Sequence, residues 1–480
     1  MNYVLRKMKV NIVVGGKAGQ GPNIVTHILA ESLIDYGWHV FYSREYESLI
    51  RGGHNFNTLT FSDSPVYSNE SKIDILVCLD EATEKKHKTK GLILKGKTEN
   101  MYYLGALFKV LGMDFKLLEE KLKKLKNFEE NLRNAKDGFE KEKTRWNIYK
   151  KVKEFSFMNG SQGIAEGSIK AGLDFYFAYP MTPATPILFE LAGKKPTIEL
   201  ENEIAVITAA LGASITGAKT MVGTSGGGFD LMTESLSMAG MAEIPVVTYL
   251  ASRPGPSTGV ATGTGQGDLN LALYSGHGEF FRLVVAHGNP DECQELVSQA
   301  FYFSQKYKIP AIVLSDKHLA ESFYSSEETP EIQESKKTTE LIRYNSYEHT
   351  QSGEATEKAE QVKKNVERRL KKIGKEKFVM HKIYGNKNAK NLVVSYGSTK
   401  GAIIDALPDN FKFLQILYLS PFPDIKKELE KAEKIILVEN SATGMLGDLI
   451  RKETGVEIKN KILRYDGKPF LSDELRGELK

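Results

Sequence analysis

The sequence predicts an α/β protein built from three domains. At 480 residues and about 150 residues per domain, the chain is long enough to form three separate cores. Short β-branched or continuously apolar segments alternate with helical periodicity, and glycines and prolines gather where the predicted strands end. We therefore expect domains over residues 1–150, 151–326 and 378–480, with a charged helical linker over residues 327–377.

The first domain opens with a predicted strand, loop and helix. The segment Lys9–Val14 is β-branched, a glycine loop follows it, and apolar residues recur at helical spacing from Ile24 to Leu33. Two more strands are expected, the alternating segment Phe56–Phe61 and the apolar run Ile73–Leu79, and together they favour a parallel sheet. Residues 85–155 are lysine-rich and amphipathic, which we interpret as helices with a solvated face.

The second domain has the pattern of a doubly wound sheet, in which strands and helices alternate. The ligand crevice of such a sheet lies beyond the carboxyl ends of its strands. The predicted strands are Phe175–Ala178, Thr197–Leu200, Thr220–Gly223, Pro245–Leu250 and Ala311–Leu314.

The linker is polar and has one helical stretch, near Glu354–Lys372. The third domain then returns to alternating strands and helices. Its strands are expected at Asn391–Ser395, Phe413–Leu419 and Lys434–Val438, and its helices at Ala402–Leu407, Ile425–Lys431 and Met445–Arg451.

Charge and hydropathy exclude several classes of protein. The 65 Lys and Arg residues nearly balance 61 Asp and Glu residues, and a formal charge of +4 leaves no basic footprint for nucleic acid. The N-terminal residues MNYVLRKMKV lack the apolar core of a signal peptide, and no apolar run reaches the ~18 residues that span a bilayer. We expect a cytoplasmic protein without a nucleic-acid or membrane partner.

The chain has two cysteines, Cys78 and Cys293. Two thiolates are too few for an iron–sulfur cluster held by this chain alone, and no Cys-x-x-Cys pair is present for dithiol chemistry. We interpret both cysteines as packing residues, so that any redox centre must lie elsewhere.

The loop Gly15–Gly21 has two interpretations. Glycines allow backbone amides to approach a phosphate at a helix N-terminus, but these glycines form neither G-x-G-x-x-G nor a P-loop. A tight structural turn therefore explains the loop at least as well. Arg44, Arg51 and His54 lie near the ends of the neighbouring strands, and we expect His54, like His277, to be structural rather than catalytic.

In the second domain, four motifs occur at or just beyond the ends of predicted strands. They are YPMTPATP (179–186), ENE (201–203), TSGGG (224–228) and SRPGPSTG (252–259). Prolines stiffen the first and last motifs, and an arginine held in such a loop can grip a carboxylate with two parallel hydrogen bonds. Taken singly, each motif also fits a rigid loop, a helix-capping carboxylate or a surface arginine.

Taken in order, YPMTPATP, ENEIAVITAALGA, TSGGG, SRPGPSTG, QGDL and GHGEF resemble the α subunit of 2-oxoacid:ferredoxin oxidoreductases. The segments GGKAGQG and SREYESLIRGGH are similar to the γ domain that one branch of this family fuses ahead of α. YGST, SPFP and YDGKPF resemble its transketolase-C-like domain. The resemblance covers nearly the whole chain apart from the linker, and it implies a γ-type domain, a pyrimidine-binding doubly wound domain and a transketolase-C-like domain, in that order.

The resemblance implies oxidative decarboxylation of a 2-oxoacid (2-oxoglutarate, pyruvate or a branched-chain oxoacid) with coenzyme A, giving acyl-CoA, CO2 and reduced ferredoxin. Thiamine diphosphate is the cofactor, and a glutamate hydrogen-bonds its aminopyrimidine ring. Glu203 is the candidate because Ala209, Ala210 and Gly212 stand at the offsets that commonly follow this glutamate. Glu201 is the alternative.

The resemblance also assigns binding roles. It implies that Arg253 and Thr182 bind the oxoacid, and that Tyr179, Pro180 and Thr182 contact the cofactor together with Glu203. It implies a coenzyme A site in the first domain, for which the candidates are Gly16, Gly19 and Gly21.

The sequence departs from the family in two places. Where the commoner family form reads PTKTEQSDL, the segment 261–269 reads ATGTGQGDL, and these added glycines leave the preferred oxoacid open. The γ-type domain is also shortened after Asp80.

No Gly-Asp-Gly occurs in the chain, although thiamine-dependent enzymes use this motif to hold Mg2+ and the diphosphate. The resemblance implies that a β subunit brings that site, the magnesium and the iron–sulfur cluster that passes electrons to ferredoxin. A non-redox thiamine-dependent lyase or carboligase is an alternative, but it would normally carry the diphosphate motif itself. A non-catalytic assembly paralogue is the other alternative, against which the joint presence of Thr182, Glu203 and Arg253 argues.

Overall fold

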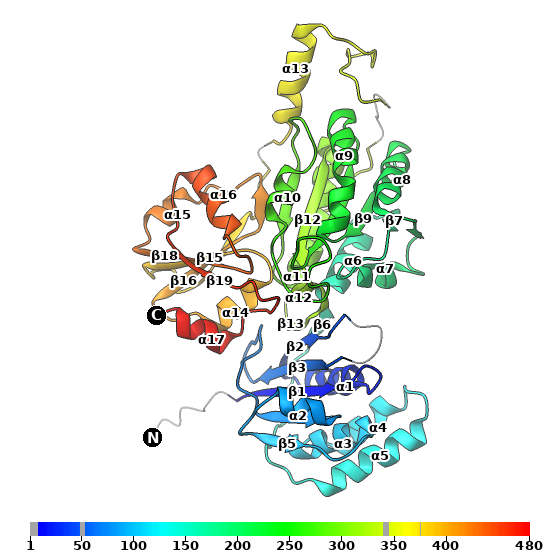
Figure 1. Ribbon diagram of the computed structural model, residues 1–480, viewed down its shortest axis with the longest axis vertical. Coiled ribbons are helices and arrows are strands. Elements are labelled where there is room, and N and C mark those ends of the chain that lie inside the picture. Colours follow the sequence, from blue (N-terminus) through cyan, green and yellow to red (C-terminus); the bar gives the residue numbers. More distant parts are fainter. Residues whose placement is uncertain (1–7, 49–52, 339–344, 375) are drawn as a thin grey trace.

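The computed structural model describes residues 8–48, 53–338, 345–374 and 376–480. Within these residues the chain forms three β-sheets flanked by helices, which confirms the predicted α/β class. Figure 1 shows the first sheet at the bottom of the molecule, the second at the upper right and the third at the left. Arg51 and parts of the predicted linker lie outside the described residues.

The first sheet is mixed rather than parallel. Its strands follow the order β5-β4-β1-β3-β2-β13-β6. β1 pairs in parallel with β4 but antiparallel with β3, where Val10 lies opposite Phe61. The strands are β1 (Lys9–Gly16), β2 (His39–Glu45), β3 (Asn55–Ser62), β4 (Ile75–Cys78), β5 (Leu92–Leu94), β6 (Ser156–Asn159) and β13 (Phe323–Ser326).

The expectation of a parallel first sheet was wrong because it omitted β2. This strand precedes β3 in the chain and pairs with it antiparallel, so that β3 runs back between β2 and β1. β6 and β13 extend the same sheet beyond β2, although both come from the segment predicted as the second domain. Its helices are α1 (Pro22–Asp35), α2 (Glu81–Lys86), α3 (Asn100–Leu111), α4 (Phe115–Leu122) and α5 (Phe128–Lys141).

The second sheet follows the order β17-β11-β12-β10-β9-β7-β8, and all the pairs within the second segment are parallel. Each strand predicted there is present, and β11 is an additional strand. The strands are β7 (Phe175–Ala178), β8 (Thr197–Glu199), β9 (Thr220–Thr224), β10 (Val246–Ser252), β11 (Leu283–Ala286) and β12 (Pro310–Asp316). The helices are α6 (Gly160–Lys170), α7 (Thr185–Leu191), α8 (Glu203–Ile215), α9 (Gly226–Ala242), α10 (Leu269–Tyr274), α11 (Pro290–Tyr307) and α12 (Lys317–Glu321).

The third sheet follows the order β14-β16-β15-β18-β19, with β14 antiparallel to its neighbour. Helix α13 (Ala359–Leu370) precedes it and projects from the top of the molecule in Figure 1. The strands are β14 (His381–Gly385), β15 (Asn391–Ser395), β16 (Phe411–Ile416), β17 (Tyr418–Ser420), β18 (Lys434–Glu439) and β19 (Asn460–Leu463), and β17 joins the second sheet. The helices are α14 (Thr399–Ala406), α15 (Lys426–Glu430), α16 (Met445–Thr454) and α17 (Ser472–Glu478).

The second and third sheets are joined by a shared core and a buried charge cluster. One apolar cluster contains residues of both sheets, among them Ile312 and Leu414. At the start of α11, the Glu292 carboxylate is 1% exposed and lies 2.7 Å from Lys400 Nζ and 2.7 Å from Gln415 Nε2. This pairing fixes the third sheet against the second.

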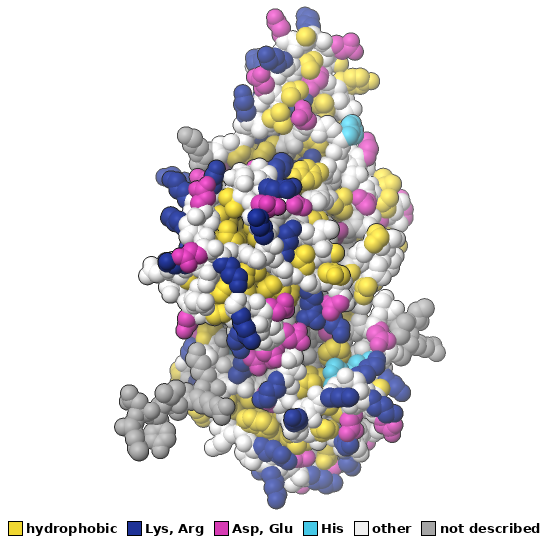
Figure 2. All heavy atoms as spheres, turned by 60° about the vertical axis from the view of Figure 1, so that its left-hand side comes forward, with side chains coloured by type: hydrophobic (Ala, Val, Ile, Leu, Met, Phe, Trp, Pro, Cys, Tyr) yellow, Lys and Arg dark blue, Asp and Glu magenta, His cyan; other side chains and the backbone are white. Residues whose placement is uncertain are grey.

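The surface carries charges of both signs. On the face drawn in Figure 2, basic and acidic side chains are interspersed over much of the surface. Among the described residues, no helix is both long and apolar enough to cross a bilayer.

Candidate functional site

The predicted motifs meet at one edge of the second sheet. Strands β10, β9 and β7 are neighbours and run parallel, so the segments that follow them leave the sheet on the same side. These segments begin at Arg253, Ser225 and Tyr179. The edge therefore brings together residues that are more than 70 positions apart in the sequence.

Glu203 begins helix α8 and is buried there. Asn202 caps the helix by accepting a hydrogen bond from Ala205 N, and Glu203 follows it with 3% of its surface exposed. Its Oε1 atom is buried and has no hydrogen-bond partner. Glu201, two residues earlier, is exposed.

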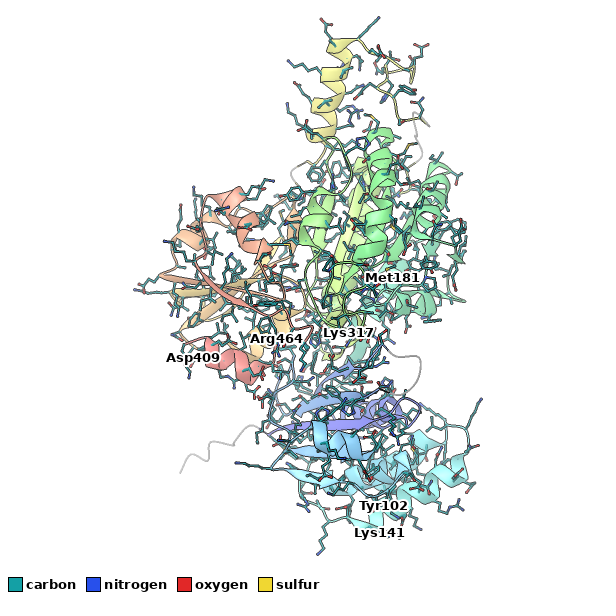
Figure 3. The ribbon with its side chains drawn as sticks, in the orientation of Figure 1. Tyr102, Lys141, Met181, Lys317, Asp409 and Arg464 are labelled. Carbon is teal, nitrogen blue, oxygen red and sulfur yellow. The ribbon has the colours of Figure 1, made fainter. Side chains whose placement is uncertain are left out.

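The first turn of α9 faces this glutamate. A Cβ atom at Gly228 would collide with Glu203 Oε1 and with Thr224 Oγ1, so only glycine lets the helix approach the carboxylate this closely. Thr224 Oγ1 is in turn 3.9 Å from Met181 Sδ, which Figure 3 labels. The YPMTPATP, ENE and TSGGG motifs are thus in direct contact.

Arg253 joins the fourth motif to the first. Its Nη1 atom donates a hydrogen bond of 2.6 Å to the main-chain oxygen of Thr182. Its Nε atom is buried without a partner. Burial lowers the pKa of the Arg253 guanidinium from its ordinary value, and the charge of Asp268 acts in the opposite direction.

Tyr179 and Pro180 lie at the outer rim of this arrangement. Both are exposed, Tyr179 to 40%. Ile204 and Leu231 are also exposed, to 52% and 50%, on α8 and α9. Large side chains thus remain uncovered around the buried glutamate.

A cavity of about 940 Å³ opens between this edge and the third sheet. Gln266 joins two of the lining segments, because its main-chain N donates to Asn440 O and its Oε1 accepts from Asn440 N. The lining residues are Ser225–Gly227, Asp230, Arg253–Ser257, Thr264, Gly265, Gly267, Asp268, Leu271, Asn440–Thr443, Met445 and Tyr465. Of the residues predicted to form the site, Arg253 is the one that lines this cavity.

Several polar atoms around the cavity are buried without a partner. They include Ser225 Oγ, Thr264 Oγ1 and Asp268 Oδ2. A buried polar atom without a hydrogen bond costs free energy, so a cluster of them at one cavity points to a polar ligand.

The sequence did not predict that residues of the third sheet line this cavity. The loop 440–443 and Tyr465 reach the cavity from strands β18 and β19. Tyr465 belongs to the YDGKPF motif, which was the one sequence signal that could have indicated it.

In the first sheet, the glycine loop is closed by its own side chain. Gln20 Oε1 accepts from Lys17 N over 2.7 Å, and Gln20 Nε2 donates to Leu79 O. Gly19 and Gly21 have positive φ, and Gly21 precedes helix α1 directly. The loop is thus a tight turn at the start of a helix, although Gly19 remains open to solvent.

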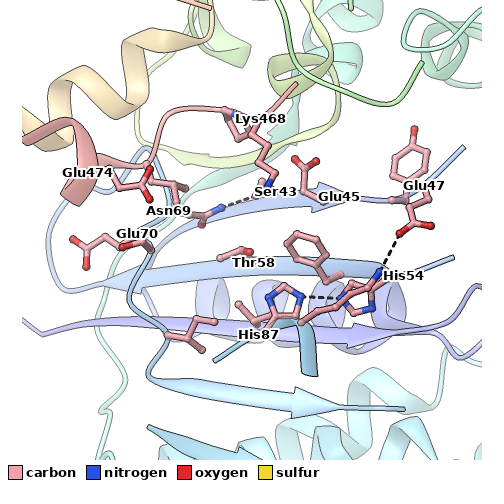
Figure 4. Close-up of a pocket in the computed structure, with 18 of the residues that line it drawn as sticks. Ser43, Glu45, Glu47, His54, Thr58, Asn69, Glu70, His87, Lys468 and Glu474 are labelled. Carbon is pink, nitrogen blue, oxygen red and sulfur yellow. Dashed lines mark hydrogen bonds and ion pairs between the residues drawn. The ribbon is translucent and has the colours of Figure 1, made fainter. Parts of the chain in front are cut away.

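A second cavity, of about 520 Å³, lies against strands of the first sheet, and its lining does not include the glycine loop. Figure 4 shows His54 and His87 facing each other in this cavity, with 2.8 Å between their Nε2 atoms. Burial lowers the pKa of both rings, that of His87 to about 4. Arg464 and Lys468 reach the cavity from the third sheet, and Figure 3 shows Arg464 and Lys317 near the junction of the three sheets.

Cys78, Cys293 and His277 line neither of these cavities. Cys78 and Cys293 are buried free thiols, and burial raises the pKa of both. The main-chain N of His277 donates to Ser237 Oγ. In the described part of the chain, no group of three or more His, Cys, Asp or Glu side chains is placed to hold a metal ion.

Comparison with protein families gives two matches. The family described as pyruvate flavodoxin/ferredoxin oxidoreductase, thiamine diP-binding, matches residues 166–393. The family described as pyruvate ferredoxin/flavodoxin oxidoreductase matches residues 11–96.

Similar proteins include two that match nearly the whole chain. The 2-oxoacid:ferredoxin oxidoreductase subunit alpha of Sulfolobus sp. is 30% identical over 98% of this chain and 96% of its own length. The 2-oxoglutarate synthase subunit KorA of Methanocaldococcus jannaschii is 32% identical over 59% of this chain and 87% of its own. The 2-oxoglutarate:ferredoxin oxidoreductase of Magnetococcus marinus, solved with 2-oxoglutarate, coenzyme A and succinyl-CoA bound, shares the fold with a TM-score of 0.88. It is 23% identical and the match covers 99% of each chain.

Proposed function

The chain belongs to the 2-oxoacid:ferredoxin oxidoreductase alpha subunits, and from this membership we propose that it is the catalytic subunit that decarboxylates a 2-oxoacid oxidatively with coenzyme A. The products would be acyl-CoA, CO2 and reduced ferredoxin, and the substrate 2-oxoglutarate, pyruvate or a branched-chain oxoacid. The environment of Glu203 is the observation that supports this proposal most directly. Glu203 is a buried carboxylate with an unpartnered oxygen at the edge where the family motifs meet.

The residues present fit the pyrimidine half of thiamine diphosphate. Glu203 Oε1 is free to bond a ring nitrogen, and Gly228 leaves the space beside it that a Cβ atom would fill. Tyr179, Pro180 and Thr182 follow the neighbouring strand β7 and would flank the same ring. When bound, thiamine diphosphate supplies a carbanion that attacks the keto carbon and accepts the electron pair released with CO2.

Burial favours Glu203 over Glu201 for this role. A carboxylate shielded from water interacts more strongly with a hydrogen-bond partner than an exposed one does. Glu203 is buried while Glu201 is exposed, and the Asn202 cap fixes the first turn that carries Glu203. Glu203 would hold the proton that it shares with the cofactor at Oε1.

Arg253 and Thr182 would position the oxoacid. The hydrogen bond from Arg253 Nη1 to Thr182 O fixes the guanidinium, and its remaining donors are available to a carboxylate at the cavity. Orienting the carboxylate that leaves as CO2 lowers the entropic part of the barrier.

The chain would act with a partner. It contains no Gly-Asp-Gly, so we assign the diphosphate site, Mg2+ and the iron–sulfur cluster to a β subunit. The exposed side chains of Tyr179, Ile204 and Leu231 around Glu203 support the proposal that the β subunit covers this face. We further propose that the complex is cytoplasmic and reduces ferredoxin.

We assign coenzyme A to the first domain, with Gly16, Gly19 and Gly21 as candidate residues. The accessible Gly19 supports this site, and the 520 Å³ cavity at the first sheet offers Lys86 and Lys468 as cations for phosphate. We keep the domain boundaries 1–150, 151–326 and 378–480, with the linker at 327–377, as part of the same proposal.

The experiment is to co-express the chain with a β subunit that carries Gly-Asp-Gly and cluster cysteines. We expect the pair to reduce a low-potential dye when given an oxoacid and coenzyme A, and the chain alone to be inactive. If the pair shows no dye reduction with pyruvate, 2-oxoglutarate or a branched-chain oxoacid, the proposal is wrong.

A further inference from the structure

The charges around the 940 Å³ cavity restrict which oxoacid it can accept. Among the described residues that line it, Arg253 is the one cationic side chain, whereas Asp230 and Asp268 are both acidic. A 2-oxoacid always brings one carboxylate, which Arg253 can pair. A dicarboxylic oxoacid brings a second, for which this wall has no further cation.

The N-terminus of helix α9 could attract that second carboxylate, but Asp268 already lies there. A Cβ atom built on Gly226, the first residue of α9, would lie 2.6 and 2.7 Å from the two Asp268 oxygens. The positive end of the helix dipole therefore already has an anion beside it.

Asp230 adds a second negative charge close by. It lies four residues after Gly226, on the same face of α9, and its side chain is exposed at the cavity. Burial raises the pKa of Asp268, and the charge of Asp230 acts in the same direction, whereas the charge of Arg253 acts in the opposite one.

Lys461 adds no cation to this wall. Lys461 Nζ donates to the main-chain oxygen of Thr443, behind the loop 440–443, and Lys461 does not line the cavity. The rest of the wall is neutral, including Leu271, Ala442 and Met445. Gly267 has no atom within 4 Å of a built Cβ, which leaves open space at this position.

We propose that the enzyme takes 2-oxoacids whose side chain is uncharged, and that Asp230 and Asp268 discriminate against dicarboxylic oxoacids such as 2-oxoglutarate. This inference rests on the proposed function, since it concerns the substrate of the same site. The charge of the oxoacid side chain is the property that decides, so oxoacids with a short, a branched or a polar uncharged side chain all belong to the accepted class.

The test compares kcat/KM in the complex with the β subunit, using dye reduction. We expect 2-oxobutyrate or 2-oxoisovalerate to exceed 2-oxoglutarate by at least about tenfold. Asp230→Asn should raise the ratio of kcat/KM for 2-oxoglutarate to kcat/KM for 2-oxobutyrate by about threefold or more, and Asp230→Lys should raise this ratio further.

Glu234→Gln is the matched control, because Glu234 is one turn further along α9 and lines a separate cavity. It removes the same charge and should leave both values unchanged. A wild-type ratio below about tenfold, a preference for 2-oxoglutarate, or an Asp230→Asn variant with the wild-type ratio would overturn this inference alone. Absence of dye reduction with every oxoacid would overturn the proposed function and this inference together.

Discussion

Arg253 Nη1 donates a hydrogen bond of 2.6 Å to the main-chain oxygen of Thr182, which lies 71 residues earlier in the chain. Both residues follow parallel strands of one sheet, β10 and β7, and β9 lies between these strands. The bond occupies one end of the guanidinium and so fixes the direction of its other donors. Arg253 is therefore held in place before any ligand binds.

Replacing Arg253 should weaken oxoacid binding. We expect Arg253→Ala to raise the apparent KM for the oxoacid about 10- to 100-fold, because a charge-assisted pair is lost, with a smaller effect on kcat. Steady-state dye reduction by the reconstituted complex measures both. Arg451→Ala, at an exposed position on α16, is the control and should behave as wild type. An effect of Arg253→Ala confined to the KM for coenzyme A would contradict its assigned role.

Adding a methyl group at Gly228 should disturb the cofactor site. The Cβ atom of Gly228→Ala would meet Glu203 Oε1 and Thr224 Oγ1, so Glu203 must move. We expect at least about tenfold weaker activation by thiamine diphosphate, with unchanged far-UV circular dichroism. Gly477→Ala on α17 is the matched control, since a Cβ there has no neighbour within 4 Å. Equal activation curves for the two variants would show that Gly228 does not shape the site.

The buried Glu292 should be important for stability. Burial on its own would raise its pKa, but the charges of Lys400 and Lys382 outweigh this and hold the pKa at about 2. Glu292→Ala leaves Lys400, 5% exposed, without its carboxylate, and we expect a loss of about 3–5 kcal/mol in urea unfolding. Glu430→Ala, which breaks an exposed pair with Lys426, should change stability by less than about 1 kcal/mol. Similar losses in both variants would contradict the buried cluster.

Stability should fall as the pH drops from about 6.5 towards 5. Burial lowers the pKa of His39, His87 and His287 to about 4, so these rings stay neutral in the folded chain while the unfolded chain binds protons near pH 6.5. Protons then favour the unfolded chain in this range, and the free energy of unfolding decreases. Thermal unfolding midpoints between pH 7.5 and 5 measure the effect.

Glu439 provides the internal check on that prediction. Burial raises the pKa of Glu439 to about 7, so that on acidification its carboxylate takes up a proton in the folded chain before it does so in the unfolded chain. This proton uptake stabilises the folded chain and opposes the destabilising effect of the histidines. Glu439→Gln removes this opposing contribution, and the midpoint should then fall more steeply between pH 7 and 5. A flat profile in the wild type, or a shallower one in the variant, would contradict these assignments.

The sequence predicted the second sheet and the motifs at its edge well, because both depend on local pattern. Apart from the more exposed β8, the strands from β7 to β12 are buried and read as apolar runs, and the motifs directly follow strands or begin the next helix. Arg253 and Thr182 could thus be placed at one crevice from their positions alone. Their roles, with those of Glu203, Tyr179 and Pro180, stay predictions.

Other features depend on pairing between distant segments and could not be read locally. β6 and β13 belong to the second segment of the chain but pair with strands of the first sheet. β3 runs antiparallel to its neighbours because it pairs with β2, which directly precedes it in the chain. The loop 440–443 reaches the cavity through Asn440, which bonds Gln266 across 174 positions. Hydrophobic periodicity reports which face of a segment is buried, but it does not report its partner.

The central claim is that Glu203 is the carboxylate that holds the cofactor ring, and the most direct test compares Glu203→Gln with Glu201→Gln in the reconstituted complex. The two substitutions are chemically identical and lie two residues apart, one buried and one exposed. We predict that Glu203→Gln keeps the wild-type circular dichroism and association with the β subunit but loses dye reduction with every oxoacid, while Glu201→Gln keeps most of it. Undiminished dye reduction by Glu203→Gln would contradict the assignment, and loss of activity in Glu201→Gln alone would move it to Glu201.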